Sequence, residues 1–406
     1  MEGKRFIRTL GLQNLLSYGS EGQEIELQPL NVIIGPNASG KSNLIEAIGL
    51  LQATPRNLAA PIREGGGVSE WLWKGEKHYP TAKIEATIDY PEGIMPLRYK
   101  LDFTMSSERL EIVDEIVENE RRVDDSDPDV YFFYRYQNGR PVLNVRNRPD
   151  ESEAGTGTNR EERGLRREDV SPEQSILSQK KDRDYYPELT YLNEHFSQIR
   201  LDREWNFGRY TTPRMPQLSD LPNDFLEEDA SNLGHVLNNL DYQGQKGLLL
   251  EHLQKFYNRI DDIMVRVQNS TLQVFLREKK LGKPVPATRL SDGTLRYLCL
   301  LAILCHPTPP PLVCIEEPEI GLHPDILSTV ADLLIKASQR TQLIVTTHSD
   351  VLVSGLSQVS ESVVVCESSQ TGSRLRRLEP DRLEKWLDKY ALGDLWRMGE
   401  IGGNLW

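Results

Sequence analysis

The sequence L-N-V-I-I-G-P-N-A-S-G-K-S, residues 30–42, decides the fold of this chain. Its apolar start predicts a buried β-strand over 30–34, and the apolar periodicity after it predicts a helix over about 42–51. Residues 35–42 fit the pattern G-x-x-x-x-G-K-[ST], whose glycines let backbone N–H groups turn toward phosphates. The helix N-terminus adds the positive end of its dipole. The flanking strand and helix therefore favour a phosphate-binding unit over a chance glycine-rich turn.

Two side chains of this loop have specific roles in such a unit. The Lys41 ammonium is expected to reach the β- and γ-phosphates of a nucleotide, and the Ser42 hydroxyl is expected to bind Mg²⁺. The residues expected around the phosphates are Gly35, Pro36, Asn37, Ala38, Ser39, Gly40, Lys41, Ser42 and Asn43. A phosphate loop alone does not distinguish kinases, GTPases and motor ATPases, so the rest of the chain must do so.

Composition excludes several classes of protein. The chain has 406 residues, of which 38% are hydrophobic and 27% charged, unlike collagen, disordered chains or disulfide scaffolds. Its net charge of −13 disfavours a chain-wide nucleic-acid-binding surface, although a local basic groove stays open. No apolar run near the cysteines approaches the ~20 residues of a membrane span, and the N-terminus has no apolar signal core. The cysteines have no metal-ligand spacing, so we expect buried, reduced thiols in a cytoplasmic protein: Cys299, Cys305, Cys314 and Cys366.

The middle of the chain follows a different pattern. Antiparallel strands are predicted over five alternating runs, the last two joined by the hairpin signal Asn138-Gly139: 82–90, 97–104, 109–117, 130–136 and 141–145. Residues 150–184 are highly charged and poor in large apolar side chains, so they cannot offset their ordering entropy and are predicted to form a mobile loop. Helical patterning over 191–199 and 230–260 and a hairpin at Asn269-Ser270 follow.

Two further apolar strands are predicted in the last third, and each ends in polar residues. Residues 311–315 run into Glu316-Glu317, a pair that suits a Mg²⁺-shell carboxylate followed by a general base; a solvated acidic turn is the alternative. Residues 343–346 end just before His348. Because the carboxyl ends of parallel strands meet at one edge of a sheet, His348 is a candidate sensor of a γ-phosphate, with a packing role as the alternative.

The segment L-S-D-G-T, residues 290–294, precedes an apolar helix over 295–304. By itself it predicts a helix N-cap formed by Ser291 or Asp292. A capped helix start with free N–H groups also binds anions, so a cap and a phosphate ligand are compatible roles for this turn.

The order of these motifs resembles that of ABC-type ATPases. The phosphate loop, L-S-D-G-T, I-E-E-P-E-I-G-L-H-P and T-T-H-S are similar to the Walker A, signature, Walker B with D-loop, and switch-histidine motifs of that class. Glu316-Glu317 followed by Gly321-Leu322-His323-Pro324 resembles the SMC/RecF-like branch and its AAA_21 group of predicted ATPases. The resemblance is strong over about residues 1–60 and 285–366 and loose between them.

The resemblance implies an α/β fold, with a P-loop NTPase core of the ABC/RecF-like type, an inserted antiparallel β subdomain and a helical lid. The core is expected in two halves, residues 1–60 and residues 286–406. The insertion between them covers 61–285 and includes the loop at about 150–184. Because it shows no sustained heptad repeat, the long coiled coil of SMC proteins is not expected.

The same resemblance implies residue roles. Glu317 would be the base that orients or deprotonates water, and His348 would sense the γ-phosphate, which makes these two the catalytic residues. Glu316 would join Ser42 at Mg²⁺. The signature turn would contact the γ-phosphate of ATP held by a second subunit, through Ser291, Asp292 and Gly293.

Two features depart from the usual pattern of these ATPases, and one residue of that pattern is not located. Glu316 stands where Asp is usual and is one methylene longer, so contact with Mg²⁺ through water is expected. The D-loop has His323 instead of Asp, as in RecF-like relatives. The glutamine of the Q-loop stays unassigned, since no pattern supports any of the four candidates: Gln52, Gln137, Gln179 and Gln198.

The function that the resemblance implies is an ATP-binding and ATP-hydrolysing switch, with ATP and Mg²⁺ as cofactors. Its ATP-sandwich homodimer, or a higher oligomer, would control nucleic-acid handling or a separate effector such as a nuclease, as in DNA repair or anti-phage (antiviral) defence. DNA and RNA are both candidate ligands, and no membrane is expected. A non-catalytic, nucleotide-dependent dimerisation scaffold is the main alternative, and a transporter-type ATPase subunit is a weaker one.

Overall fold

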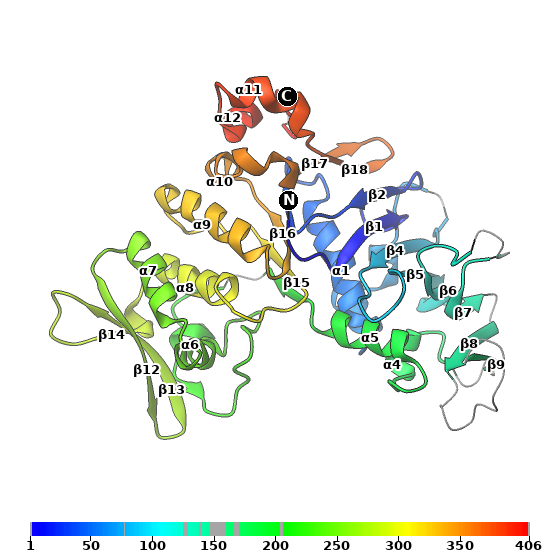
Figure 1. The fold of residues 1–406 in the computed structure, drawn as a ribbon, viewed down its shortest axis with the longest axis horizontal. Helices are drawn as coiled ribbons and strands as arrows, with labels where there is room; N and C mark the ends of the chain where they lie inside the picture. Colours follow the sequence, from blue (N-terminus) through cyan, green and yellow to red (C-terminus); the bar gives the residue numbers. More distant parts are fainter. Residues whose placement is uncertain are drawn as a thin grey trace.

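The computed structural model describes residues 2–76, 78–124, 129–137, 140–146, 160–165, 170–203 and 206–404. Within them the chain forms a parallel sheet between layers of helices, a long antiparallel sheet on one side, and a lid of helices and strands on the other (Figure 1). The two ends of the chain meet in the parallel sheet, because β3 from the start of the chain lies between β16 and β17 from its end.

The parallel sheet has the strand order β10-β15-β16-β3-β17-β18. Its first five strands are parallel and β18 is antiparallel: β10 (Arg200–Asp202), β15 (Leu312–Glu316), β16 (Gln342–Thr346), β3 (Leu30–Ile34), β17 (Val363–Ser369) and β18 (Gly372–Arg377). Every residue of β3 and β16 is buried, as is typical of parallel strands covered on both faces. The predicted strands that end in the phosphate loop, the acidic pair and the histidine are therefore neighbours.

Helices cover both faces of this sheet (Figure 1): α1 (Lys41–Ala53) on one, α8 (Asp292–Leu304) and α9 (Pro324–Ala337) on the other. Alternate strand residues point into two hydrophobic cores, as the pleat requires. Ile33 and Ile344 belong to the core that contains α1, whereas Ile34 and Val345 belong to the core that contains α8 and α9.

The antiparallel sheet has eight strands in the order β2-β1-β4-β5-β6-β7-β8-β9. They are β1 (Ile7–Gln13), β2 (Gln23–Glu26), β4 (Ala82–Ile88), β5 (Leu97–Ser106), β6 (Arg109–Asn119), β7 (Phe132–Gln137), β8 (Arg140–Arg146) and β9 (Arg160–Gly164). The predicted strands after the first helix thus continue a sheet that β1 and β2 begin. The pairing of Gln137 with Arg140 confirms the predicted hairpin, although Asn138-Gly139 lies outside the described residues.

The prediction of a mobile loop over 150–184 is wrong at residues 160–164 and 176–179. Residues 160–164 form β9, which pairs with β8, and residues 176–179 form α4 (Ile176–Gln179). Ile176 is fully buried, and its N–H donates to the carboxylate of Glu115 on β6 over 2.9 Å. A distant strand therefore supplies the partner that the local sequence lacks. Residues 150–159 and 166–169 lie outside the described residues.

The lid combines helices with a small antiparallel sheet. Its elements are η3 (Thr212–Arg214), β11 (Gln217–Leu218), α6 (Leu233–Tyr242), α7 (Lys246–Phe256), β12 (Ile260–Gln268), β13 (Thr271–Glu278), β14 (Val285–Pro286) and η4 (Ala287–Arg289). The helical pattern over 230–260 is divided because Gly244, with a φ of 77°, follows the end of α6. The hairpin at Asn269-Ser270 joins β12 to β13 as predicted.

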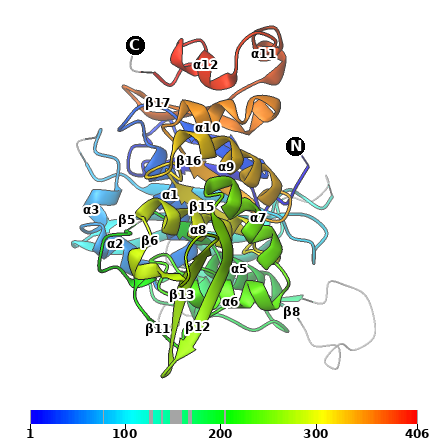
Figure 2. The same cartoon turned by 90° about the vertical axis from the view of Figure 1, so that its left-hand side faces the viewer.

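The remaining helices are short. α2 (Ala59–Glu64), α3 (Val68–Trp71) and α5 (Pro187–Ser197) lie near α1, while α10 (Asp350–Ser354), η5 (Ser357–Ser362), α11 (Pro380–Leu387) and α12 (Leu392–Arg397) form the C-terminal end (Figures 1 and 2). None of the described helices has the length and apolar character needed to cross a membrane. All four cysteines are buried and free, as expected.

Candidate functional site

The loop between β3 and α1 has two glycines that no other residue could replace without strain. Gly35 has a φ of 149°, and a Cβ there would lie 2.1 Å from the carbonyl oxygen of Cys366. Gly40 has a φ of 108°, and a Cβ there would lie 2.2 Å from Ser373 Oγ. Both positions need the conformational freedom of glycine, and both are crowded from the outside. The loop is therefore pressed into a tight turn at the carboxyl edge of the sheet.

Lys41 lies inside this turn. Its Nζ donates to the carbonyl oxygens of Gly35 at 2.8 Å and Pro36 at 2.9 Å, and the side chain is buried. Burial lowers the pKa of Lys41, and the nearby Glu316 and Glu317 act in the opposite direction. A cation held by two carbonyl oxygens can exchange them for the oxygens of a phosphate, which binds it more strongly.

Four residues outside the motif brace the loop. Ser39 O accepts hydrogen bonds from Ser373 Oγ at 2.6 Å and from Cys366 Sγ at 3.2 Å, and Gly40 O accepts one from Tyr18 at 3.1 Å. Ser17 Oγ lies 2.7 Å from Ser373 Oγ. Burial raises the pKa of the Cys366 thiol, which keeps it protonated and able to donate. The sequence gives no signal for these contacts, since the residues come from opposite ends of the chain.

The first acid of the pair at the end of β15 lies beside Ser42. A side-chain hydrogen bond joins Ser42 to Glu316, and burial raises the pKa of Glu316. A hydroxyl and a carboxylate at one place are the hard oxygen ligands that Mg²⁺ prefers. Among the described residues no three His, Cys, Asp or Glu side chains gather into a metal-binding group, so Mg²⁺ here would draw further ligands from phosphate and water. The two residues fit the ion.

The second acid faces the histidine. Glu317 Oε1 lies 3.6 Å from His348 Nε2, and both side chains are partly exposed at the same edge. Glu317 has a φ of 44°, in the left-handed region, and its N–H donates to Thr346 O over 3.0 Å. A non-glycine residue in this region is strained by about 1–3 kcal/mol, and such residues cluster at functional sites. The strained backbone directs this carboxylate toward His348.

His348 is held in place by an acid that sequence reasoning missed. Glu319 Oε1 accepts from the His348 backbone N–H at 2.7 Å and from Thr347 Oγ1 at 2.8 Å. Burial is the main cause that lowers the pKa of His348, and the charge of Lys41 adds to it. The imidazole is therefore neutral at neutral pH. The position of Glu319, two residues after Glu317 in the same motif, is the feature of the sequence that could have identified it.

The signature turn, residues 290–294, lies at the N-terminus of α8, where Ser291 and Asp292 are exposed. Ser291 Oγ accepts from Thr294 N at 3.1 Å, which confirms the predicted N-cap. Asp292 forms an ion pair with the lid residue Arg214. A Cβ on Gly293 would lie 2.5 Å from Gly321 O, so this turn packs closely against the loop that follows β15.

None of the four candidate glutamines takes a place at this edge. Gln52 donates to Ile199 O at 2.7 Å, Gln179 bonds to residues around α4, Gln198 ends α5, and Gln137 ends β7 in the other sheet. The strand β10, which pairs with β15, ends instead in Asp202 and is followed by Arg203. Arg203 Nη1 lies 4.0 Å from Glu46 Oε1, and its charge opposes the burial that raises the pKa of Glu316. An arginine therefore lies beside the proposed Mg²⁺ carboxylate.

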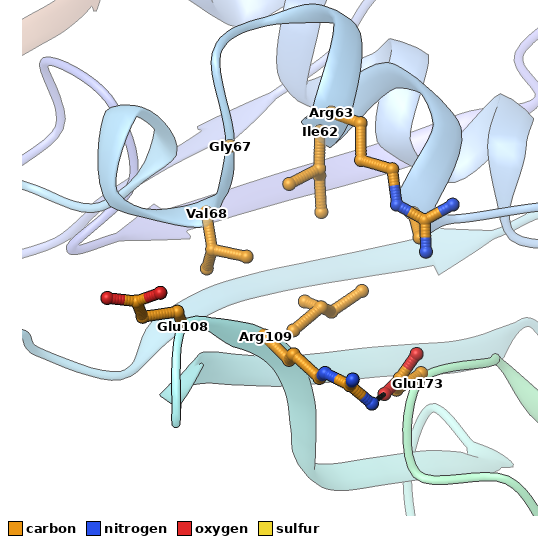
Figure 3. A pocket seen from close by; sticks show the side chains of 9 residues that line it. Ile62, Arg63, Gly67, Val68, Glu108, Arg109 and Glu173 are labelled. Carbon is orange, nitrogen blue, oxygen red and sulfur yellow. Dashed lines mark ion pairs between the residues drawn. The ribbon is translucent and has the colours of Figure 1, made fainter.

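One cavity borders the site, and another is lined by none of the site's residues. One of about 990 Å³ is bordered by Glu316, Arg203 and Glu46 and extends toward the lid. The other, of about 420 Å³, lies between α2–α3 and the β5–β6 turn (Figure 3). Its Arg109 is paired with Glu173 at 3.7 Å, beside the apolar Ile62 and Val68. The second cavity is lined by none of the residues of the phosphate loop, the acidic pair or the histidine, so the carboxyl edge of the sheet is the stronger candidate.

Comparisons with known proteins agree with this geometry. The family AAA_21, described as "AAA domain, putative AbiEii toxin, Type IV TA system", matches residues 30–354. The DNA replication and repair protein RecF of Staphylococcus haemolyticus is 35% identical over 92 residues. That alignment covers 22% of this chain and 22% of RecF, so it spans only a small part of the relative's length.

Solved structures of SMC heads share the fold. The SmcHead bound to the C-winged helix domain of ScpA has a TM-score of 0.58 at 14% identity, with 93% of this chain and 99% of that one covered. An Smc head domain with an extended coiled coil, bound to the C-terminal domain of ScpA derived from Pyrococcus furiosus, has a TM-score of 0.55 at 13% identity, with 95% and 99% covered. At such identities the likeness concerns the fold alone.

Proposed function

The chain belongs to the AAA_21 family and is a P-loop ATPase of the RecF/SMC type, and from this premise we propose that it is an ATP-hydrolysing switch. The observation that carries the proposal is the meeting of Lys41, Glu317 and His348 at one edge of the sheet. Glu317 and His348 approach to 3.6 Å, and Lys41 is close enough to shift the pKa of His348.

The residues divide the work of hydrolysis between them. Lys41 binds the β- and γ-phosphates in place of the loop carbonyls, and the N–H groups of the loop and of α1 face the same oxygens. Mg²⁺, held by Ser42 and Glu316, would neutralise phosphate charge. Glu317 accepts the proton of the attacking water, and the neutral His348 hydrogen-bonds the γ-phosphate or the water.

The exposed signature turn supports the proposal that two copies share each ATP. Ser291 and Gly293 lie at a helix N-terminus, which favours an anion. They contact Thr294 and Gly321, and neither of these belongs to the phosphate loop. Ile320 and Val351, which flank the acidic pair and the histidine, are 50% and 38% exposed. Apolar side chains next to a charged site suit a surface that a second copy covers.

Three observations bear on what the switch controls. The RecF match favours nucleic-acid handling as in DNA repair, and the family description names a "putative AbiEii toxin, Type IV TA system". The SMC heads that share the fold were solved with a bound partner protein, which supports a partner for this chain too. We propose control of a separate effector, with DNA or RNA as the ligand that triggers it.

Phosphate release from purified protein tests the proposed activity. Glu317→Gln should bind ATP normally but hydrolyse it about 10²–10⁴-fold more slowly, which is the usual contribution of a positioned base. Lys41→Ala should lose ATP binding, because it removes the main cation facing the phosphates. Glu24→Gln, at an exposed position of β2, is the control. Wild-type turnover in Glu317→Gln would place the base elsewhere, and a wild-type chain that binds ATP without hydrolysis would favour the scaffold.

A further inference from the structure

One arginine of the lid is buried against the signature turn. Arg214, the last residue of η3, is only 5% exposed. Its Nε donates to Phe207 O at 3.0 Å, and its Nη1 donates to Ala287 O at 3.3 Å and to Leu290 O at 2.5 Å. Its Nη2 pairs with the carboxylate of Asp292. The guanidinium thus contacts Phe207 and η4 and, through Leu290 and Asp292, the signature turn at the start of α8.

These partners surround Ser291. Leu290 precedes it, Asp292 follows it, and both are held by the same guanidinium. The five donors of an arginine form a rigid planar fork, so the groups that they bind are fixed relative to one another. Removal of such a side chain would leave buried carbonyl oxygens without their donors. The backbone conformation of the turn therefore depends on Arg214.

The charge of Arg214 has a second effect. The Asp292 carboxylate is exposed at the helix N-terminus where a phosphate is expected to bind. The Asp292 carboxylate and a phosphate bound beside it would repel each other, because both are negative. The Arg214 guanidinium offsets that repulsion, because its positive charge is paired with the Asp292 carboxylate.

The opposite side of the turn is fixed by the loop after β15. The Gly293 backbone packs against Gly321, and Arg296 Nη1 donates to Ile320 O. The turn is thus held between the lid and the loop that follows Glu317. The contact with Arg214 comes from the lid.

From this arrangement we infer that Arg214 is a positioning residue for ATP bound by the opposite subunit: it holds Ser291 and Gly293 in the shape that meets the γ-phosphate. The inference rests on the proposed shared ATP site. It assigns the lid a role in hydrolysis, since any movement of η3 shifts the signature turn. Arg214 does not contact the phosphate loop of its own chain in this scheme.

Hydrolysis by Arg214→Met is the first test. We expect unchanged ATP affinity and a kcat about 10²-fold lower, a loss typical of a misplaced reacting group. Arg214→Lys keeps the charge but not the fork, so we expect a smaller loss of kcat. Arg289→Met, an exposed arginine in η4, is the matched control and should behave as wild type. Wild-type kcat in a folded Arg214→Met protein would overturn the inference.

Complementation separates a positioning role from a general loss of stability. In a mixture of Arg214→Met with Lys41→Ala, one composite site has an intact phosphate loop and an intact signature turn, so hydrolysis should rise above that of either variant. A mixture of Arg214→Met with Ser291→Arg should stay inactive, because both chains lack the signature turn. Differently tagged chains that co-purify show that heterodimers form. If Arg214→Met is unfolded in a thermal melt, the same two mixtures are made with Arg214→Lys.

The outcomes distinguish the inference from the function on which it rests. If Ser291→Arg and Lys41→Ala form heterodimers but do not restore hydrolysis, ATP is not shared and the proposed function fails. If the Ser291→Arg and Lys41→Ala pair does restore hydrolysis, the proposed function stands. The role of Arg214 is then wrong in either of two cases: Arg214→Met restores hydrolysis when mixed with Ser291→Arg, or it fails to restore hydrolysis when mixed with Lys41→Ala.

Discussion

Glu317 and His348 come from different strands and meet because β15 and β16 are neighbours in the parallel sheet. Glu317 is oriented by its own backbone, and His348 is oriented by the neighbouring Glu319. Glu317 is turned by its positive φ, and the His348 backbone is bound by Glu319. At this scale the site depends on a backbone conformation and a hydrogen bond between two motifs, neither of which the motifs alone reveal.

The titration of His348 leads to a testable pH dependence. Burial and Lys41 lower its pKa from the ordinary value of 6.5, so the imidazole gains its proton only below pH 6.5. Protonation adds a positive charge near Lys41 and removes the free lone pair of the ring. We expect kcat/KM, which reports the free enzyme, to be constant above pH 6.5 and to fall as the pH drops through the lowered pKa.

The control for this profile is a second histidine. His348→Gln should have low activity without the acidic limb, whereas His78→Gln, at an exposed position, should keep the wild-type profile. An acidic limb that persists in His348→Gln would assign the titration to another group.

At the scale of elements, α12 packs against the start of α10, which follows the His348 loop (residues 347–349). A Cβ on Gly393 would lie 2.0 Å from Asp350 O, and Arg397 pairs with Asp350 at 3.1 Å. The segment that follows reaches the phosphate loop, because a Cβ on Gly403 would lie 3.5 Å from Gly35 Cα. The C-terminal end therefore supports both the histidine loop and the phosphate loop.

Gly393→Ala tests this support. The added methyl group should displace α12 from α10, lower the free energy of unfolding by about 1–3 kcal/mol, and reduce ATP turnover because the His348 loop shifts. Denaturant unfolding and phosphate release measure the two effects. Gly282→Ala is the matched control, since a Cβ there meets nothing within 4 Å. Equal stability of the two variants would show that α12 adapts to the methyl group.

At the scale of the whole molecule, the proposed function requires a pair of chains to complete each ATP site. The exposed side chains of Ile320 and Val351 follow Glu317 and His348 three residues later in the sequence. Closure of two copies would bury these apolar side chains and bring each signature turn to the partner's ATP. The lid then moves with the signature turn through Arg214.

ATP should therefore act as the link between two chains. Glu317→Gln with ATP and Mg²⁺ is expected to behave as a dimer in light scattering, because it binds ATP and cannot release it by hydrolysis. Lys41→Ala under the same conditions should keep the mass that the wild type has without nucleotide. A Glu317→Gln protein whose mass does not change with ATP would contradict the shared site.

The sequence by itself determined the local units of this protein. The strand–loop–helix at 30–51, the apolar strands before Glu316 and Thr347, the N-cap at Ser291 and the hairpin at Asn269-Ser270 all follow from short-range periodicity and turn chemistry. The order of the motifs also indicated the family. These features are readable because backbone geometry and capping depend on residues close in sequence.

The tertiary structure alone decided the rest. Residues 176–179 pack because Glu115 on a distant strand accepts their N–H group, and the phosphate loop is braced by Ser373 from the other end of the chain. Arg214 gained its role only when folding brought the lid to the signature turn. The partner of a buried polar group is set by which strands become neighbours, and no local pattern encodes that choice.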